Sequence, residues 1–289
     1  MIHLANHHSH TNFSDGHATP EQFVNKALDN NLVTLGFSDH APIPVEGLVG
    51  MKLEDLPSYS LVIDRLRNQT QEDLQIYKSL EVDYIPGIIN VDSPHIQSAG
   101  LDYILGAVHY VGQFADGSFW SFESGQEHFE RGLHEIYSGD IREAISRYYE
   151  LIREMLNLHT PDIVAHLDRI KKLNGENRYF NEKEKWYREL VTETLETIAA
   201  KNVIMEINTK GVYKNETSDT YPSFWILEIA NELGIATHLA SDAHHPDDLQ
   251  GAFDFGLKQL KKAGYKKTFI RLDNEWQDSA LIGDRIFIF

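Results

Sequence analysis

Residues 5–17 read ANHHSHTNFSDGH, and they place four of the chain's 15 histidines and an aspartate beside the first predicted strand, residues 2–8. Short apolar runs that end in polar residues are typical of β-strands. Because successive side chains of a strand point to opposite faces, His8 and His10 share one face, while His7 lies on the other. Two imidazoles on one face can bind one divalent cation, although two hydrogen-bonded structural histidines would give the same pattern.

Further along the chain, histidines and carboxylates recur where predicted strands end. Six more strands are predicted, over residues 33–38, 76–84, 103–108, 163–166, 203–207 and 236–240, and the run KTFIRL or the run RIFIF is expected to complete the set. Five of these strands carry metal-ligand side chains at or near their ends, namely His40, Glu81, His109, His166, and the pair Asp242 and His244. So many ligands exceed what one tetrahedral site uses, and more than one ion is therefore expected.

Helical patterns separate the predicted strands. The segments TPEQFVNKALDNN, GDIREAISRYYELIREMLNLH and NEKEKWYRELVTETLETIAAKN carry apolar residues at helical spacing. This alternation predicts an α/β fold, either a barrel or an open doubly wound sheet. The ligand-type residues favour the barrel, because a barrel gathers the carboxyl ends of its strands into one ring. A single domain is expected over residues 1–289.

The composition narrows the chemistry and the partners. The 289 residues include no cysteine, so a disulfide and a thiolate metal site are both excluded. The formal charge of −18 disfavours nucleic acid and an acidic membrane surface as partners. The first residues lack the features of a signal peptide, and no apolar run is long enough to span a membrane, so a cytoplasmic protein is expected. The oligomeric state is left open.

The motifs together resemble those of a known family. H-S-H-T, S-D-G, S-D-H-A-P, L-E-V-D-Y, G-A-V-H, A-H-L-D and S-D-A-H follow one another between residues 6 and 246, as in the polymerase-and-histidinol-phosphatase (PHP) superfamily. FSDHAPIP, LEVDYIPG and EINTKGVYKNETSDTYPS resemble most closely the stand-alone histidinol-phosphatases of that superfamily. The resemblance implies a distorted, TIM-like (β/α)7 barrel of the PHP type that binds three divalent metal ions, with zinc, manganese or iron as candidates.

The resemblance also implies a ligand set and an activity. The first metal would be bound by His8, His10, Glu81 and Asp242, the second by Glu81, His109 and His166, and the third by Asp15, His40 and His244. For the third metal, His17 is an alternative to Asp15. Asp15, Asp242 and His244 are the expected catalytic residues. The implied reaction is the hydrolysis of a small phosphorylated substrate, L-histidinol phosphate, to L-histidinol and phosphate in histidine biosynthesis, by metal-activated water.

Substrate contacts are predicted from charge and position. Candidates for phosphate binding are Lys214 in the GVYK segment and Lys171 and Lys172 after AHLDR, and Asp83 is a candidate partner for the substrate amine. Solvated lysines and a structural hydrogen bond are the alternatives. In the aromatic segment VGQFADGSFWSFESGQ, Trp120 or Phe122 could cover an imidazole ring, or both could pack in a hydrophobic lid.

Three other functions stay open from the sequence. A PHP phosphoesterase acting on another small phosphate ester or on a nucleotide would use the same ligands. An amidohydrolase would usually carry a bridging lysine where this chain has Glu81. A non-catalytic metal-binding scaffold would differ in lacking turnover.

Overall fold

Seven parallel strands form the main sheet of the computed structural model, which describes residues 5–70, 72–282 and 285–287. The strands, in their order across the sheet, are β1 (Ala5–Asn6), β2 (Thr34–Phe37), β3 (Gln75–Asp83), β4 (Tyr103–Ala107), β7 (Ile163–Val164), β8 (Ile204–Asn208) and β9 (Thr237–Ala240). Each coincides with a predicted strand, although the predicted start of the first strand, residues 2–4, lies outside the described residues.

The sheet curls until its first and last strands meet. Ser9 forms a parallel bridge with Ala243 just beyond the ends of β1 and β9. The backbone N–H of His10 donates to the carbonyl of Ala243 at 2.8 Å, and the N–H of Ala243 donates to the carbonyl of His8 at 3.2 Å. These bonds nearly close the sheet, so the predicted α/β barrel is confirmed and the open sheet is excluded.

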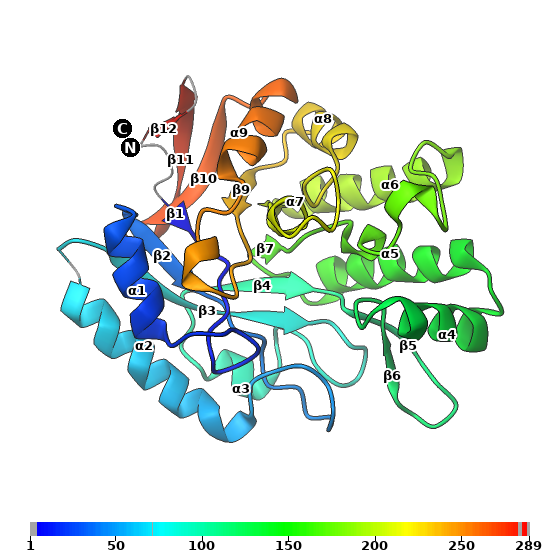
Figure 1. Cartoon of the computed structure of the whole chain (residues 1–289), viewed down its shortest axis with the longest axis horizontal. Coiled ribbons are helices and arrows are strands. Elements are labelled where there is room, and N and C mark those ends of the chain that lie inside the picture. Colours follow the sequence, from blue (N-terminus) through cyan, green and yellow to red (C-terminus); the bar gives the residue numbers. More distant parts are fainter. Residues whose placement is uncertain (1–4, 71, 283–284, 288–289) are drawn as a thin grey trace.

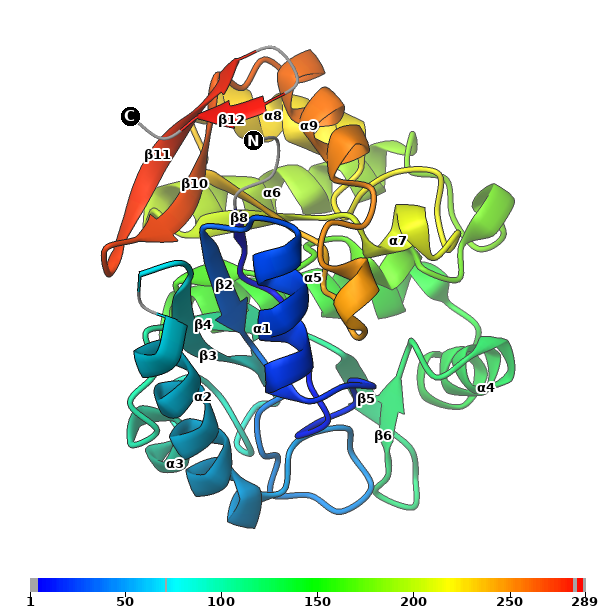
Figure 2. The same cartoon turned by 60° about the vertical axis from the view of Figure 1, so that its left-hand side comes forward.

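Helices cover the outside of the barrel (Figures 1 and 2). They are α1 (Pro20–Asp29), α2 (Leu56–Thr70), α3 (Pro94–Gln97), α4 (Gln126–Tyr137), α5 (Ile141–Leu158), α6 (Lys185–Lys201), α7 (Lys210–Tyr213), α8 (Phe224–Glu232) and α9 (Phe253–Lys262), with 3₁₀ segments at Leu53–Asp55, Arg169–Lys171, Gly175–Asn177 and Pro246–Asp248. A side-chain cap marks the beginning of α5, where Asp140 accepts from the backbone N–H groups of Arg142 and Glu143. No helix in the described ranges is both long and apolar enough to cross a membrane.

Two small antiparallel sheets lie outside the barrel. One is the hairpin of β5 (Tyr110–Gln113) and β6 (Phe119–Ser121), and the other comprises β10 (Lys267–Leu272), β11 (Glu275–Ile282) and β12 (Arg285–Phe287). Asp273 and Asn274, with φ of 51° and 64°, turn β10 back into β11. KTFIRL and the described part of RIFIF are strands, as predicted, but they pair within this C-terminal sheet and not with the barrel strands.

The barrel interior is apolar at one end and polar at the other. Residues that share the apolar end are Tyr77, Tyr103, Leu105, Ala107, Ile163, Ala165 and Ile204, and Trp276 of the C-terminal sheet packs against them. Along β3, Leu80 and Val82 pack in the outer layer beneath α1 and α2, whereas Glu81 and Asp83 face inward. The strand period of two therefore brings carboxylates to the interior at the carboxyl end of the barrel.

Candidate metal centre

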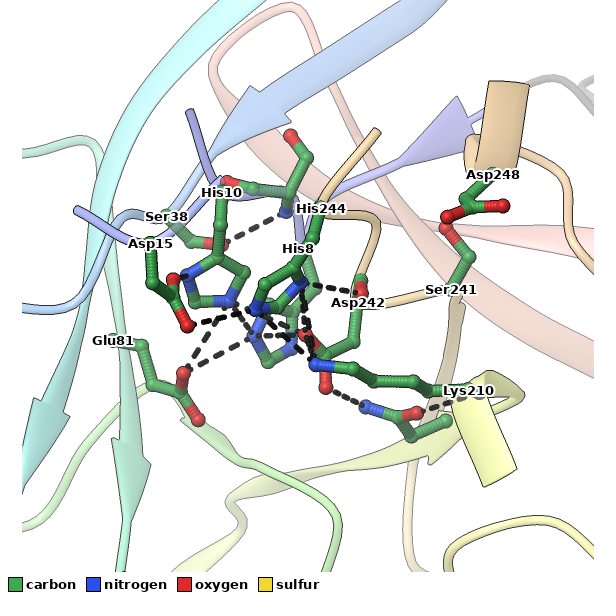
Figure 3. A network of polar contacts seen from close by, with 12 residues as sticks. His8, His10, Asp15, Ser38, Glu81, Lys210, Ser241, Asp242, His244 and Asp248 are labelled. Atoms are coloured by element: carbon green, nitrogen blue, oxygen red, sulfur yellow. Dashed lines mark hydrogen bonds and ion pairs between the residues drawn. The ribbon is translucent and has the colours of Figure 1, made fainter. Parts of the chain in front are cut away.

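The two histidines beyond the end of β1 lie side by side. Nε2 of His8 and Nε2 of His10 are 2.9 Å apart, so the shared face predicted for these residues is confirmed. Asp242 Oδ1 lies 3.8 and 3.3 Å from the two nitrogens, and Glu81 Oε2 lies 3.4 Å from each of them. All four side chains are buried, and Figure 3 shows them converging on one point.

A second group adjoins the first through Glu81. The Oε1 atom of Glu81 lies 2.7 Å from Nε2 of His166 and 3.7 Å from Nε2 of His109. Glu81 is on β3, and the two histidines follow the neighbouring strands β7 and β4. The carboxylate thus contacts the first group with one oxygen and the second group with the other.

A third group lies nearest the solvent. Asp15 Oδ2 is 3.1 Å from Nε2 of His244 and 3.8 Å from Nε2 of His40, and Asp15 Oδ1 is 3.6 Å from Nδ1 of His10. The Asp15 side chain is 37% exposed, in contrast with the buried first group. His17 is exposed and contributes a backbone N–H to the carbonyl of His244, so the structure places Asp15 rather than His17 in this group.

The donor atoms of these groups fit a metal ion. The sets His8–His10–Asp242, Glu81–His109–His166 and His10–Asp15–His40–His244 each have candidate ligand atoms within 4.8 Å of one another, as does His40–Asp83–His109. Imidazole nitrogens and carboxylate oxygens are ligands of zinc, manganese and iron. Among the described residues, the buried Nδ1 atoms of His10 and His40 have no hydrogen-bond partner, which leaves them available to a cation.

The carboxylates of the centre are held in the charged form. Burial opposes ionisation of Glu81, but the surrounding imidazoles, His8 foremost, hold the pKa of Glu81 well below its usual range. Burial also opposes ionisation of Asp242, and the Lys210 ammonium together with His8 holds the pKa of Asp242 well below its usual range. Both groups therefore present negative charge at neutral pH, which favours cation binding.

Other carboxylates orient the imidazole rings. Asp83 Oδ1 accepts hydrogen bonds from Nδ1 of His109 at 2.9 Å and from its backbone N–H at 3.0 Å. Glu206 Oε1 accepts from Nδ1 of His8 at 2.5 Å. A ring that donates through Nδ1 presents the lone pair of Nε2 to the centre. The structural hydrogen bond considered for Asp83 is therefore present.

A cavity of about 200 Å³ opens over the three groups. Its lining includes three cationic side chains, Lys210, Arg169 and Lys172. Lys210 Nζ donates to Asp242 Oδ1 at 3.0 Å, and Figure 3 shows the Lys210 side chain reaching the ligand groups. Arg169 donates two hydrogen bonds to Glu123 at 2.7 and 2.9 Å. Cations beside a metal centre suit a small anionic ligand.

Of the three lysines predicted to bind phosphate, Lys172 lines the cavity and the other two lie elsewhere. Lys214 is 43% exposed and pairs with Asp248 at 2.8 Å. Lys171 is buried, and its ammonium is hydrogen-bonded to Asp168 at 2.7 Å and to the carbonyl of Thr220 at 2.9 Å. The structure places neither lysine in the lining of the cavity, because partners outside it bind both ammonium groups. Asp83 does line the cavity.

The aromatic segment forms a packed lid rather than an aromatic wall. Trp120 and Phe122 are fully buried in the hydrophobic core beside α4 and α5, and the Trp120 indole donates to the carbonyl of His128 at 3.2 Å. The polar neighbours of these rings, Ser121 and Glu123, line the cavity instead. Alternation along β6 and the residues after it explains the division.

Sequence reasoning missed Lys210, Arg169 and Glu206. One signal could have identified Glu206: residues 203–207 form the single predicted barrel strand without an assigned ligand-type residue, yet they contain this glutamate. Lys210 lies two residues beyond β8, where a barrel directs loops toward its site. Arg169 had no comparable signal, because a 3₁₀ segment follows His166 and turns the arginine into the cavity.

The protein is a nearly closed parallel barrel that carries, at its carboxyl end, imidazole and carboxylate clusters suited to bind metal ions. The family model described as PHP domain matches residues 6–210, and the chain belongs to this family. A probable histidinol-phosphatase of Deinococcus radiodurans is 28% identical over 94% of this chain and 98% of its own.

Two solved structures share the fold. One, described as a putative histidinol phosphatase from Listeria monocytogenes, has a TM-score of 0.77 and 22% identity, and the match covers 87% of this chain and 99% of that one. The other is histidinol phosphate phosphatase from Lactococcus lactis, complexed with zinc, L-histidinol and phosphate. It has a TM-score of 0.65 and 20% identity, with 99% of each chain covered.

Proposed function

We propose that this protein is a histidinol-phosphatase, a metal-dependent phosphomonoesterase that hydrolyses L-histidinol phosphate to L-histidinol and phosphate. The observation that carries the proposal is the set of three adjoining imidazole and carboxylate groups beneath a cavity lined by cations. The D. radiodurans relative supports it, because it bears the name histidinol-phosphatase over nearly the full length of both chains. The L. lactis protein binds zinc, L-histidinol and phosphate in the same fold.

We propose further that the centre holds three divalent ions, with zinc, manganese or iron as the candidates. The residues that would hold them are the nine of the predicted set: His8, His10, Asp15, His40, Glu81, His109, His166, Asp242 and His244. When bound, such ions lower the pKa of coordinated water and stabilise the negative charge that develops on a phosphate ester.

The chain's own groups would bind and orient the substrate. Asp15, Asp242 and His244 are the proposed catalytic residues, since all three line the cavity at the metal groups. Lys210 would contact phosphate oxygen, because its ammonium already lies at the carboxylate of Asp242. Arg169 would set the position of Glu123 at the opposite wall. Asp83 would act by holding the His109 ring.

We infer that residues 1–289 make up one domain. The C-terminal sheet supports this inference because it packs directly on the barrel: Thr268 Oγ1 donates to the carbonyl of Thr237 at 2.9 Å, and Nδ1 of His238 donates to the carbonyl of Phe269 at 2.9 Å. Trp276 also covers the apolar end of the barrel interior. The sheet thus completes the barrel's core rather than forming a core of its own.

Phosphate release tests the proposed activity. Protein of measured metal content is assayed with L-histidinol phosphate, p-nitrophenyl phosphate, nucleotides, sugar phosphates and an amide substrate. We expect kcat/KM to be highest for L-histidinol phosphate. Equal or faster hydrolysis of a nucleotide would favour a different PHP phosphoesterase, amide hydrolysis would favour an amidohydrolase, and no turnover by metal-loaded protein would favour a scaffold.

A further inference from the structure

Glu206 is a completely buried carboxylate that belongs to none of the metal-ligand groups found among the described residues. It lies on β8, and a buried charge of this kind is costly unless hydrogen bonds compensate it. Both of its oxygens have such partners. Oε1 accepts from Nδ1 of His8 at 2.5 Å, and Oε2 accepts from the backbone N–H of His166 at 2.8 Å.

The two partners of Glu206 belong to different ligand groups. His8 is in the group with His10 and Asp242, whereas His166 is in the group with Glu81 and His109. The hydrogen bond to His8 directs the lone pair of its Nε2 into the centre. The hydrogen bond to His166 acts on the backbone, where φ is +22°, a conformation that a residue with a side chain rarely adopts.

Asn208 extends the same network to a third ligand. It lies two residues after Glu206 on β8, so both side chains point into the barrel. Its amide nitrogen donates to Glu206 Oε2 at 3.1 Å and to Asp242 Oδ2 at 3.3 Å. Asn208 is fully buried, and these bonds fix its orientation together with that of Asp242.

We propose that Glu206, assisted by Asn208, is the positioning residue of the metal centre. It fixes the positions of ligands from two ligand groups relative to one another. The inference rests on the metal centre of the proposed function and is independent of the substrate. Because Glu206 accepts hydrogen bonds from His8, His166 and Asn208, it acts through these residues. Removing it would loosen the ligands without removing any of them.

The test is zinc affinity, measured without substrate by competition with a chromophoric chelator. Glu206→Gln keeps the shape of the side chain. Its amide nitrogen, itself a donor, would face either the N–H of His8 or the N–H groups of His166 and Asn208, so the hydrogen bonds on that side would be lost. We expect its zinc dissociation constants to rise about 10- to 100-fold, the range found when a group that orients a metal ligand is lost. Excess zinc should restore much of the turnover, with little change in KM.

Glu182→Gln is the matched control. Glu182 also accepts from a ring N–H, that of Trp225 at 2.8 Å, but it lies outside the cavity over the metal groups. This variant should bind zinc like the unaltered protein. If Glu206→Gln is folded by circular dichroism and binds zinc with unchanged affinity, the proposal is overturned, whether or not the protein hydrolyses histidinol phosphate.

A measurement on the unaltered protein covers the case in which Glu206→Gln does not fold. In the zinc-loaded protein with ¹⁵N-labelled histidine, NMR should show a proton on Nδ1 of His8 in a strong hydrogen bond and zinc coordination through Nε2. Zinc coordination through Nδ1, or an Nδ1 without a proton, would overturn the assignment of Glu206.

Discussion

Glu81 contacts members of all three ligand groups. Its Oε2 lies 3.4 Å from the Nε2 atoms of His8 and His10 and 3.2 Å from Nδ1 of His40, while its Oε1 faces His166. Because its two oxygens point in different directions, this one carboxylate can contact all three groups.

Replacing Glu81 with glutamine should therefore disrupt the centre while preserving the fold. An amide has the shape of the carboxylate but one good ligand oxygen and no charge, so we expect loss of at least one metal per chain and a fall in kcat of more than about 100-fold. Elemental analysis and phosphate release measure both effects. His245→Gln is the control, because the His245 side chain is 49% exposed and bonds the N–H of Asp247. Full metal content and near-normal turnover in folded Glu81→Gln would show that Glu81 does not bridge.

Lys210 and Lys214 provide a matched pair of cations. We expect Lys210→Gln to lower kcat/KM for L-histidinol phosphate about 10- to 100-fold, since a hydrogen bond to a charged group contributes about 1.5–3 kcal/mol. Lys214→Gln should change it less than about twofold, because Lys214 pairs with Asp248 at the surface. Steady-state kinetics of the two variants measure both changes in kcat/KM. A larger loss in Lys214→Gln would return the phosphate contact to the residue predicted from the sequence.

At the scale of elements, β9 and β10 meet through a buried histidine. His238 on β9 is fully buried beside His7, the histidine that the strand period turns away from His8 and His10. Burial lowers the pKa of His238 to about 4, and its Nδ1 donates to the carbonyl of Phe269 on β10. The imidazole of His238 is therefore neutral at pH 7, because burial disfavours its charged form.

Acid should destabilise the folded protein through His238, because protonation would place a charge in this buried position. The pKa of a histidine in the unfolded chain is about 6.5, so between that value and about 4 the unfolded state binds the extra proton and stability falls as the pH falls. From pH 7 to pH 4.5, His238 should cost the metal-free protein roughly 2 kcal/mol of unfolding free energy. Urea denaturation of the metal-free protein and of His238→Gln at both pH values measures this difference. Equal losses of unfolding free energy in the unaltered protein and in His238→Gln would contradict this expectation.

The elements themselves were largely predictable, and the exceptions have physical causes. Short apolar runs located all seven barrel strands, because the pattern of apolar side chains that marks a strand can be read locally in the sequence. KTFIRL carries the same apolar signal, but the turn at Asp273 and Asn274 pairs it with β11 instead of the barrel. No strands were predicted in the aromatic segment that forms the hairpin of β5 and β6, because the pairing partner of a strand cannot be read from that strand alone.

At the scale of the whole molecule, an acidic chain contains a site for an anionic substrate. The formal charge is −18, yet three divalent ions would outweigh the carboxylates that bind them and make the centre locally positive. Lys210, Arg169 and Lys172 at the cavity add to this positive potential. The overall charge therefore does not oppose phosphate binding.

Metal removal should affect activity and stability together. We expect a chelator to abolish phosphate release and to lower the melting temperature, because an ion present at 100 times its dissociation constant stabilises the folded state by about 2.7 kcal/mol. Added zinc, manganese or iron should restore both. Elemental analysis should find close to three ions per chain. A fully active protein with one ion or none would refute the trinuclear centre.

The sequence by itself predicted the barrel and the candidate ligands, because strand period and strand-end position are local properties of the chain. The absence of cysteine excluded thiolate chemistry. His8, His10 and Glu81 could be named from the residues themselves, whereas the family resemblance implied Asp15 with His17 as an alternative. Only the tertiary structure decided that Asp15 rather than His17 joins its group, that Lys210 rather than Lys214 or Lys171 lines the cavity, and that Glu206 holds His8. Each of these depends on which ends of distant strands the closed barrel brings within hydrogen-bond distance, and residues 198 positions apart in the chain carry no local sign of that contact.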